Sequence, residues 1–181
     1  MKKPIYIVPL VLLFCFTIAC QNKAEKAELE KYRAQAKVEE QNKALVVRLF
    51  EELNKRNAEI VKELYAPTVK SYSPSGSTTP TSQNEAYELT KTYLNAFPDL
   101  NQTIEELVAS GNKVTVRFIV RGTHKGDFQG IPATGNKMEL SGITIVRIED
   151  GKIVEERQEV DSLGFMTQLG MELKPIAAKK K

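Results

Sequence analysis

The sequence predicts an α+β domain, a cone-shaped barrel in which three N-terminal helices pack on a curved antiparallel sheet. Two observations predict this class. Apolar residues recur at helical spacing between about residues 41 and 97, and alternate with a period of two after residue 100. Hairpin turns join the alternating runs, which favours antiparallel pairing. Because such a sheet buries its apolar face against a second layer, the helices must cover it, with a cavity expected between the layers.

Two helices open the folded part of the chain. The first has one apolar face at helical spacing, formed by Leu45, Val46, Leu49, Phe50 and Leu53. The second follows Asn57 and turns a smaller apolar face inward, formed by Ile60, Val61 and Leu64. Pro67 ends this pair, because proline cannot continue a helix. Each of these helices therefore has one face to bury against a sheet.

A strand, a loop and a third helix are expected next. Residues 68–72 suit a short strand. Residues 73–82, SPSGSTTPTS, are expected to form a loop and to be the most mobile internal segment, because they offer little apolar surface. Ser82 and Glu85 form a capping box that begins the third helix, and Pro98 follows its end. The inward side of this helix is formed by Ala86, Thr90, Tyr93 and Phe97.

Four strands follow the third helix. Residues 100–108 alternate weakly and residues 114–120 cleanly, with a turn at Ser110-Gly111-Asn112. Residues 138–148 are apolar on both faces, and Glu149-Asp150-Gly151 forms a hairpin turn into residues 152–161. One helical layer covers only one face of a sheet, so the second apolar face predicts a homodimer.

The N-terminus resembles the signal of a bacterial lipoprotein. Lys2 and Lys3 precede the apolar run from Ile5 to Ile18, and TIAC at residues 17–20 resembles a lipobox, in which Cys20 carries the lipid. The expected organisation is a signal peptide over 1–19, a charged helical stalk over 20–40, a folded domain over 41–170 and a basic tail over 171–181. The expected location is the bacterial cell envelope, on the periplasmic or outer surface. An ordinary cleaved signal peptide and an uncleaved anchor are the alternatives.

Composition excludes several kinds of site. Cys15 lies in the signal segment and Cys20 would carry the lipid, so the folded domain has no thiol for a disulfide, a nucleophile or a thiolate metal site. The single histidine, His124, makes a poor metal site alone, and no phosphate loop or HExxH motif occurs. We therefore expect no metal and no cofactor. The formal net charge is +3, but Lys2, Lys3 and four lysines of the tail supply six positive charges, so the rest of the chain carries about −3 and nucleic acid is not an expected partner.

The stretch RGTHKGDFQGIPATG, residues 121–135, carries four of the ten glycines and His124 between two strand-like segments. Glycine permits positive φ, and Ile131-Pro132 favours an extended entry to a turn, so the stretch is typical of a long, shaped hairpin connection. His124 is interpreted either as a hydrogen-bonded turn residue or as a residue that contacts a ligand.

Residues 121–135, together with GITIVRIEDGKIVEERQEVDSLGFMTQLG at 142–170, resemble the SnoaL-like polyketide cyclase (ester cyclase) family of the nuclear transport factor 2-like superfold. LVVRLFEELNKRNAEIVKELYAP and NAFPDLNQTIEELVASGNKV fit the same family. The resemblance covers roughly residues 41–170 and implies the cone-shaped fold. Members of this superfold commonly dimerise through the outer face of the sheet.

The resemblance also implies a chemistry. The family closes polyketide rings by an intramolecular aldol reaction without metal or cofactor, using an aspartate at the end of the last strand as the base. By position that residue is Asp161, for which burial in an apolar cavity would strengthen basicity. Asp161 equally suits the N-cap of a terminal helix. His124 matches the family's loop histidine at the cavity rim, where it would orient a ligand.

The chain departs from the family pattern at two places. Tyr72-Ser73-Pro74 and Arg157 stand where members often carry His-Asp-Pro and a tryptophan. A different ligand is therefore expected. Three functions remain open: a cofactor-free lyase, cyclase or isomerase acting on a small apolar carbonyl compound, a non-catalytic module that binds a small apolar ligand at the envelope, and an assembly module that dimerises through its sheet. The membrane would be contacted through the lipid anchor.

Overall fold

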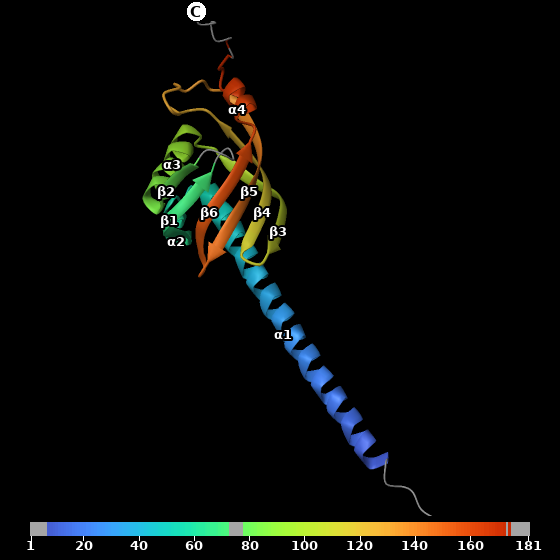
Figure 1. Cartoon of the computed structure of the whole chain (residues 1–181). Coiled ribbons are helices and arrows are strands. Elements are labelled where there is room, and N and C mark those ends of the chain that lie inside the picture. Colours follow the sequence, from blue (N-terminus) through green and yellow to red (C-terminus); the bar gives the residue numbers. More distant parts are fainter. Residues whose placement is uncertain (1–6, 73–77, 173, 175–181) are drawn as a thin grey trace, which may run out of the picture. The chain divides into compact units, whose positions relative to one another are not determined.

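The structure is a computed structural model that describes residues 7–72, 78–172 and 174. In chain order its elements are α1 (Ile7–Asn54), α2 (Glu59–Leu64), β1 (Tyr65–Tyr72), β2 (Thr78–Ser82), α3 (Gln83–Ala96), β3 (Asn101–Ser110), β4 (Lys113–Thr123), β5 (Lys137–Glu149), β6 (Lys152–Val160) and α4 (Ser162–Gln168) (Figure 1). The predicted order of two helices, a strand, a helix and four strands is confirmed, and β2 and α4 are added to it.

The strands form one sheet in the order β2-β1-β6-β5-β4-β3. Neighbouring strands are antiparallel except for β1 and β6, which run parallel. The alternation predicted for residues 114–120 is confirmed, since Val114, Val116, Phe118 and Val120 are all buried. The α+β class, with helices packed on a curved, mainly antiparallel sheet, is therefore confirmed.

The predicted loop over residues 73–82 is wrong in its second half. Residues 78–82 form β2, whose register against β1 runs from Thr68↔Ser82 to Tyr72↔Thr78. Three threonines favour an extended chain, and Pro80 is tolerated because β2 lies at the edge of the sheet. Composition alone suggested a loop because it gave Ser, Pro and Gly more weight than the β-branched residues. Residues 73–77, on which the rest of the prediction falls, lie outside the described residues.

Helices cover one face of the sheet and enclose the core with it. The buried helical side chains include Val46 and Phe50 of α1, and Phe50 meets Phe118 of β4 edge-on at 5.9 Å between ring centroids. Polar contacts fix the end of α1 against the sheet edge. The Asn54 amide donates to the Gln102 carbonyl and accepts from the Gln102 N–H, at 2.8 and 2.7 Å.

A bulge in β6 decides which of its side chains face the helices. Ile148 pairs with Ile153, but the preceding Arg147 pairs with Glu155, so β6 has one extra residue at this point. Since side chains alternate with a period of two, the extra residue exchanges the two faces of the strand beyond it. The residues that face the helices after the bulge are Glu156, Gln158 and Val160.

Residues up to Val38 form a compact unit separate from the unit that begins at Glu39. Within the first unit, the described side chains from Lys23 to Val38 are all exposed, including Leu29 and Tyr32. No helix in the described residues is long and apolar enough to cross a membrane.

Candidate functional site

A cavity of about 260 Å³ lies between the helices and the sheet. Its apolar lining consists of Leu53, Leu89, Leu94, Leu100, Phe118, Val120, Met138, Leu140, Val160 and Phe165. Its polar lining consists of Ser71, Tyr72, Thr90, Tyr93, Gln102, Glu156 and Gln158. A mostly apolar cavity with a few polar groups is typical of a site for a small organic molecule.

Among the described residues, Glu156 is the only one with a carboxyl group in the lining of this cavity. Its Oε1 accepts a hydrogen bond of 2.7 Å from the hydroxyl of Tyr65. Burial raises the pKa of Glu156, and the hydrogen bond from Tyr65 only partly opposes that rise. A carboxyl in this environment holds its proton at a higher pH than an exposed glutamate does, and becomes a stronger base once ionised.

Tyr65 is positioned by the junction between α2 and β1. It is the C-cap residue of α2, where its N–H donates to the Val61 carbonyl, and it is also the first residue of β1. Its side chain is 7% exposed. Burial, followed by the nearby Glu156 carboxylate, raises the pKa of Tyr65 well above its ordinary value. The hydroxyl therefore stays protonated and acts as a fixed donor to Glu156.

Four further polar groups of the lining have no hydrogen-bond partner within the described part of the chain. These are the side-chain amides of Gln102 and Gln158 and the hydroxyls of Tyr72 and Tyr93. Each can donate to an acceptor on a bound molecule. No lysine, arginine or histidine lines the cavity in the described residues. Those residues also contain no group of three or more His, Cys, Asp or Glu side chains arranged to hold a metal ion.

Asp161, the residue predicted from the sequence as a base, is the N-cap of α4. Its Oδ1 accepts from the Gly164 N–H at 2.8 Å, and its side chain is exposed. Asp161 therefore caps the helix, which is the second role that its place in the sequence suggested. Asp161 is not among the residues that line the inner cavity. A catalytic role for Asp161 stays a prediction.

His124 is fully buried just beyond β4, in the glycine-rich connection. Its Nδ1 lies 3.1 Å from the Thr134 hydroxyl, and its ring stacks on Phe97 at 5.3 Å between centroids. The backbone N–H of His124 donates to the backbone carbonyl of Asn136, as it does in a hydrogen-bonded turn residue. Nε2 is buried without a partner in the described residues. His124 is not among the residues that line the inner cavity, and a ligand contact by this residue stays a prediction.

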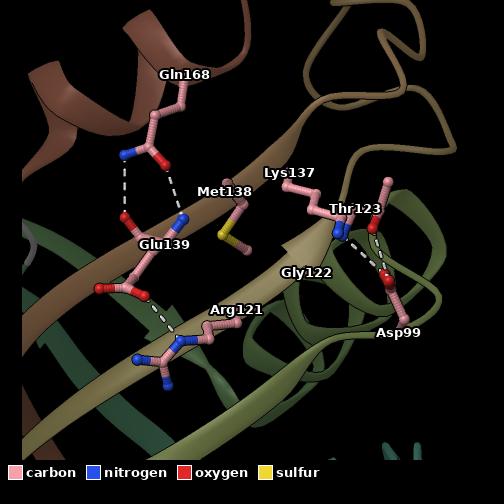
Figure 2. Close-up of a pocket in the computed structure, with 8 residues that line it drawn as sticks. All are labelled: Asp99, Arg121, Gly122, Thr123, Lys137, Met138, Glu139 and Gln168. Carbon is pink, nitrogen blue, oxygen red and sulfur yellow. Dashed lines mark hydrogen bonds and ion pairs between the residues drawn. The ribbon is translucent and has the colours of Figure 1, made fainter.

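A second pocket of about 380 Å³ opens on the surface where β4, β5 and α4 meet (Figure 2). Most polar side chains that line this pocket form hydrogen bonds or ion pairs within the protein. Asp99 accepts from the N–H and the hydroxyl of Thr123 at 2.7 and 2.6 Å, and Arg121 pairs with Glu139 at 2.7 Å. The Gln168 amide bonds to the N–H and carbonyl of Glu139. These contacts leave few polar groups to receive a ligand, so the inner cavity is the better candidate site.

Sequence reasoning missed Glu156. Strict alternation from the apolar Ile153 places Glu155, Arg157 and Asp161 on the inner face, and Glu156 on the outer one. The bulge after Ile153 reverses this assignment. One signal could have found it: Val160 is the last apolar residue of the strand, and counting back from it by twos gives Gln158 and Glu156.

Comparison with known proteins places this fold and cavity in a family. The model of the family described as "SnoaL-like polyketide cyclase" matches residues 44–169. The chain is 34% identical over 88 residues to aklanonic acid methyl ester cyclase DnrD from Streptomyces peucetius and to DauD from Streptomyces sp. (strain C5). Each alignment covers 48% of this chain, with 61% of DnrD and 55% of DauD, so the chain spans somewhat more than half the length of these relatives.

Solved structures agree with this placement. A SnoaL-like protein from Jannaschia sp. CCS1 is 25% identical, with a TM-score of 0.67 over 75% of this chain and 95% of its own. IdmH from Streptomyces antibioticus is 28% identical, with a TM-score of 0.62 over 72% of this chain and 99% of its own. The helices on a curved sheet, the enclosed cavity and the match over residues 44–169 lead to one conclusion: this chain belongs to the SnoaL-like polyketide cyclase family, with the nuclear transport factor 2-like fold.

Proposed function

We propose that the domain binds a small, mostly apolar carbonyl compound in the inner cavity and catalyses proton transfer on it without a cofactor, as an aldol cyclase, an isomerase or a lyase does. One observation carries this proposal: a cavity of about 260 Å³ with a mainly apolar lining encloses a carboxyl group. Apolar walls exclude water and strengthen the carboxyl as a base, which is what removal of a proton beside a carbonyl requires. Similarity to ester cyclases supports the same class of substrate.

The test uses 2-tetralone, a small neutral ketone with an acidic C–H beside its carbonyl. Binding to the full-length protein is measured by titration, and exchange of the α-proton for deuterium is followed by NMR. Leu140→Trp, which fills the cavity, is expected to weaken binding by at least about tenfold, because the added ring takes the space of the ligand. Ser141→Trp, on the opposite face of the same strand, is the matched control.

The enzyme and the binding module, both left open by the sequence, differ in the second readout. Binding with accelerated exchange supports the enzyme, whereas binding without exchange supports a module that only holds its ligand. Equal binding by the wild type and Leu140→Trp would contradict the inner cavity as the site.

A location at the bacterial cell envelope, through a lipid on Cys20, is a further part of the proposal. The TIAC pattern at residues 17–20 and the charged helical segment after it support an anchored, envelope-facing domain. The wild type is expected to incorporate a labelled fatty acid, and Cys20→Ser to incorporate none. Absence of label on the wild type would contradict the anchor.

We also propose that the domain is a homodimer that pairs through the outer face of the sheet. This face carries Val108 of β3 and Ile143 and Ile145 of β5, which are 62%, 48% and 40% exposed. Apolar side chains gathered on one face favour burial against a second copy. Light scattering of the protein is expected to give the mass of a dimer, and Ile145→Lys the mass of a monomer. A monomer mass for the wild type well above micromolar concentration would contradict the dimer.

A further inference from the structure

We propose that Glu156, held by the hydroxyl of Tyr65, is the group that exchanges a proton with the compound bound in the inner cavity. This inference rests on the proposed function and assigns its acid/base residue.

The position of Glu156 is the first support. The bulge in β6 turns Glu156 and Gln158 toward the helices, so that both line the cavity. Asp161 lies past the end of β6, three residues beyond Gln158. Its carboxylate accepts a hydrogen bond from the Gly164 N–H as the N-cap of α4. Among the residues that line the cavity, only Glu156 can accept a proton as a carboxylate.

The contact with Tyr65 is the second support. The hydroxyl donates to Oε1 at 2.7 Å, which fixes the carboxyl group and leaves Oε2 without a partner in the described residues. A base must be held in one orientation with an oxygen free to reach the proton it removes. Tyr65 therefore acts as a positioning residue for Glu156.

The chemical step is balanced within the cavity. The Glu156 carboxylate removes a proton from the carbon beside the carbonyl. The electron pair of the broken C–H bond forms the C=C bond of an enolate, and the negative charge moves to the carbonyl oxygen. Gln158 and Tyr93, whose donors have no partner in the described residues, are placed to bind that oxygen. Return of a proton from Glu156 to carbon restores the carboxylate. In D2O the proton on Glu156 is first replaced by a deuteron from the solvent, so the returned atom is deuterium, and nothing is oxidised or reduced.

The charges around Glu156 define the class of ligand. The titratable groups in the cavity wall are Tyr72, Tyr93 and Glu156 itself, with Tyr65 directly behind the carboxyl group. The wall, as far as the structure describes it, contains no cation to hold an anionic ligand. A carboxylate in an apolar cavity repels a second carboxylate. We therefore expect a neutral ketone or ester, and not the corresponding free acid, to bind.

The experiment measures binding and deuterium exchange of 2-tetralone by full-length Glu156→Gln. Glutamine keeps the shape of the side chain and can still accept from Tyr65, so binding is expected to change less than about threefold. Exchange is expected to fall by about a hundredfold or more, because glutamine accepts no proton from carbon. Glu159→Gln, on the outer face of the same strand, is the matched control and is expected to exchange at the wild-type rate.

Each outcome separates this inference from the proposed function. Wild-type exchange that persists in Glu156→Gln would overturn the role of Glu156 and leave the proposed function standing. Failure of the wild type to bind, or to exchange what it binds, would overturn the catalytic function and the inference together. Loss of exchange in Glu156→Gln with retained binding would support both.

Tyr65→Phe tests the positioning role through the pH dependence of exchange, which would not change if Tyr65 were only structural. The hydrogen bond from Tyr65 lowers the pKa of Glu156, so its removal is expected to raise that pKa further. Exchange by a carboxylate base increases as pH rises through its pKa, so the rise should move to higher pH in Tyr65→Phe. A lower rate with an unmoved pH profile would overturn the positioning role.

Discussion

Asp99 of the surface pocket and Glu156 of the inner cavity both carry a carboxyl group, but the pKa values of these two groups are shifted in opposite directions. In the surface pocket, the Asp99 carboxylate receives two hydrogen bonds from Thr123, and these lower its pKa. In the inner cavity, Glu156 has one donor, Tyr65, and burial raises its pKa. The difference shows that the surroundings of a carboxyl group, more than its residue type, decide in which direction its pKa is shifted.

The two sites also differ in what surrounds their charges. In the surface pocket, several charged side chains have partners within the protein, as in the pairing of Arg121 with Glu139 (Figure 2). Among the described residues, the lining of the inner cavity contains one carboxyl group, several donors without partners and no cation. The polar groups of the surface pocket are therefore mostly bonded within the protein, whereas several polar groups of the inner cavity are not.

The largest expected difference between the two sites is in stability. Phe118 and Arg121 lie on the same strand, the first lining the inner cavity and the second the surface pocket. Phe118→Ala should lower the free energy of unfolding by about 3–5 kcal/mol, because Phe118 is 3% exposed and packs on Phe50. Arg121→Ala should cost less than about 1 kcal/mol, because an exposed ion pair contributes little. Chemical denaturation measures both, and equal losses would contradict this distinction.

The pH dependence of stability should have opposite signs at the two carboxyl groups. Because the pKa of Glu156 is raised in the folded state, its contribution is fully present below the ordinary glutamate value and is lost as pH rises through the raised value. The pKa of Asp99 is lowered, so its contribution is present above the ordinary aspartate value and is lost as pH falls through the lowered one.

Denaturation of Glu156→Gln and Asp99→Asn across pH tests these signs. Glu156→Gln should gain stability relative to the wild type as pH rises, and Asp99→Asn should gain it as pH falls. A stability difference between the wild type and Glu156→Gln that does not vary with pH would mean that this carboxyl group is not shifted by burial.

A smaller effect is expected at Asp161. Asp161→Ala removes the acceptor for the Gly164 N–H and should cost about 1 kcal/mol, whereas Asp161→Asn keeps a capping oxygen and should cost little. Thermal unfolding measures both variants. The same Asp161→Asn protein tests the base predicted from the sequence, since a fall in 2-tetralone exchange of about a hundredfold would assign the proton transfer to Asp161 and remove it from Glu156.

The smallest effect is expected in the surface pocket. Thr123→Val removes the hydroxyl that donates to Asp99 and leaves the backbone donor in place. The pKa of Asp99 should rise toward its ordinary value, with a loss of stability below about 1 kcal/mol because the pair is exposed. NMR titration of the Asp99 carboxyl group measures the change, and an unmoved pKa would show that the hydroxyl contributes nothing.

The C-terminal part of α1, together with α3 and β4, could be predicted because each follows one period over many residues, and the turns at residues 110–112 and 149–151 marked the strands beside them. The capping box of Ser82 and Glu85 is present as expected, since its two hydrogen bonds depend on local sequence alone. β2 could not be predicted, because an edge strand in a polar segment is specified by its partner β1 and not by an apolar pattern of its own.

The candidate site could be predicted only in part. An enclosed cavity follows from one helical layer on a curved sheet, but its carboxyl group depends on a single extra residue in β6. A bulge leaves no clear mark in KIVEERQEV, where charged residues occupy both faces. The sequence therefore indicated this end of the sheet, but it did not indicate that Glu156 lines the cavity.

The central claim is that Glu156 lies in an apolar cavity as the group that meets the ligand. The most direct test is carbon-13 NMR titration of the Glu156 carboxyl group in the full-length protein, with and without 2-tetralone, using Glu156→Gln to assign the signal. The Glu156 carboxyl group is expected to titrate above the range of ordinary glutamates, and its titration is expected to change when 2-tetralone is present. Titration within the ordinary range, unaffected by 2-tetralone, would contradict the central claim.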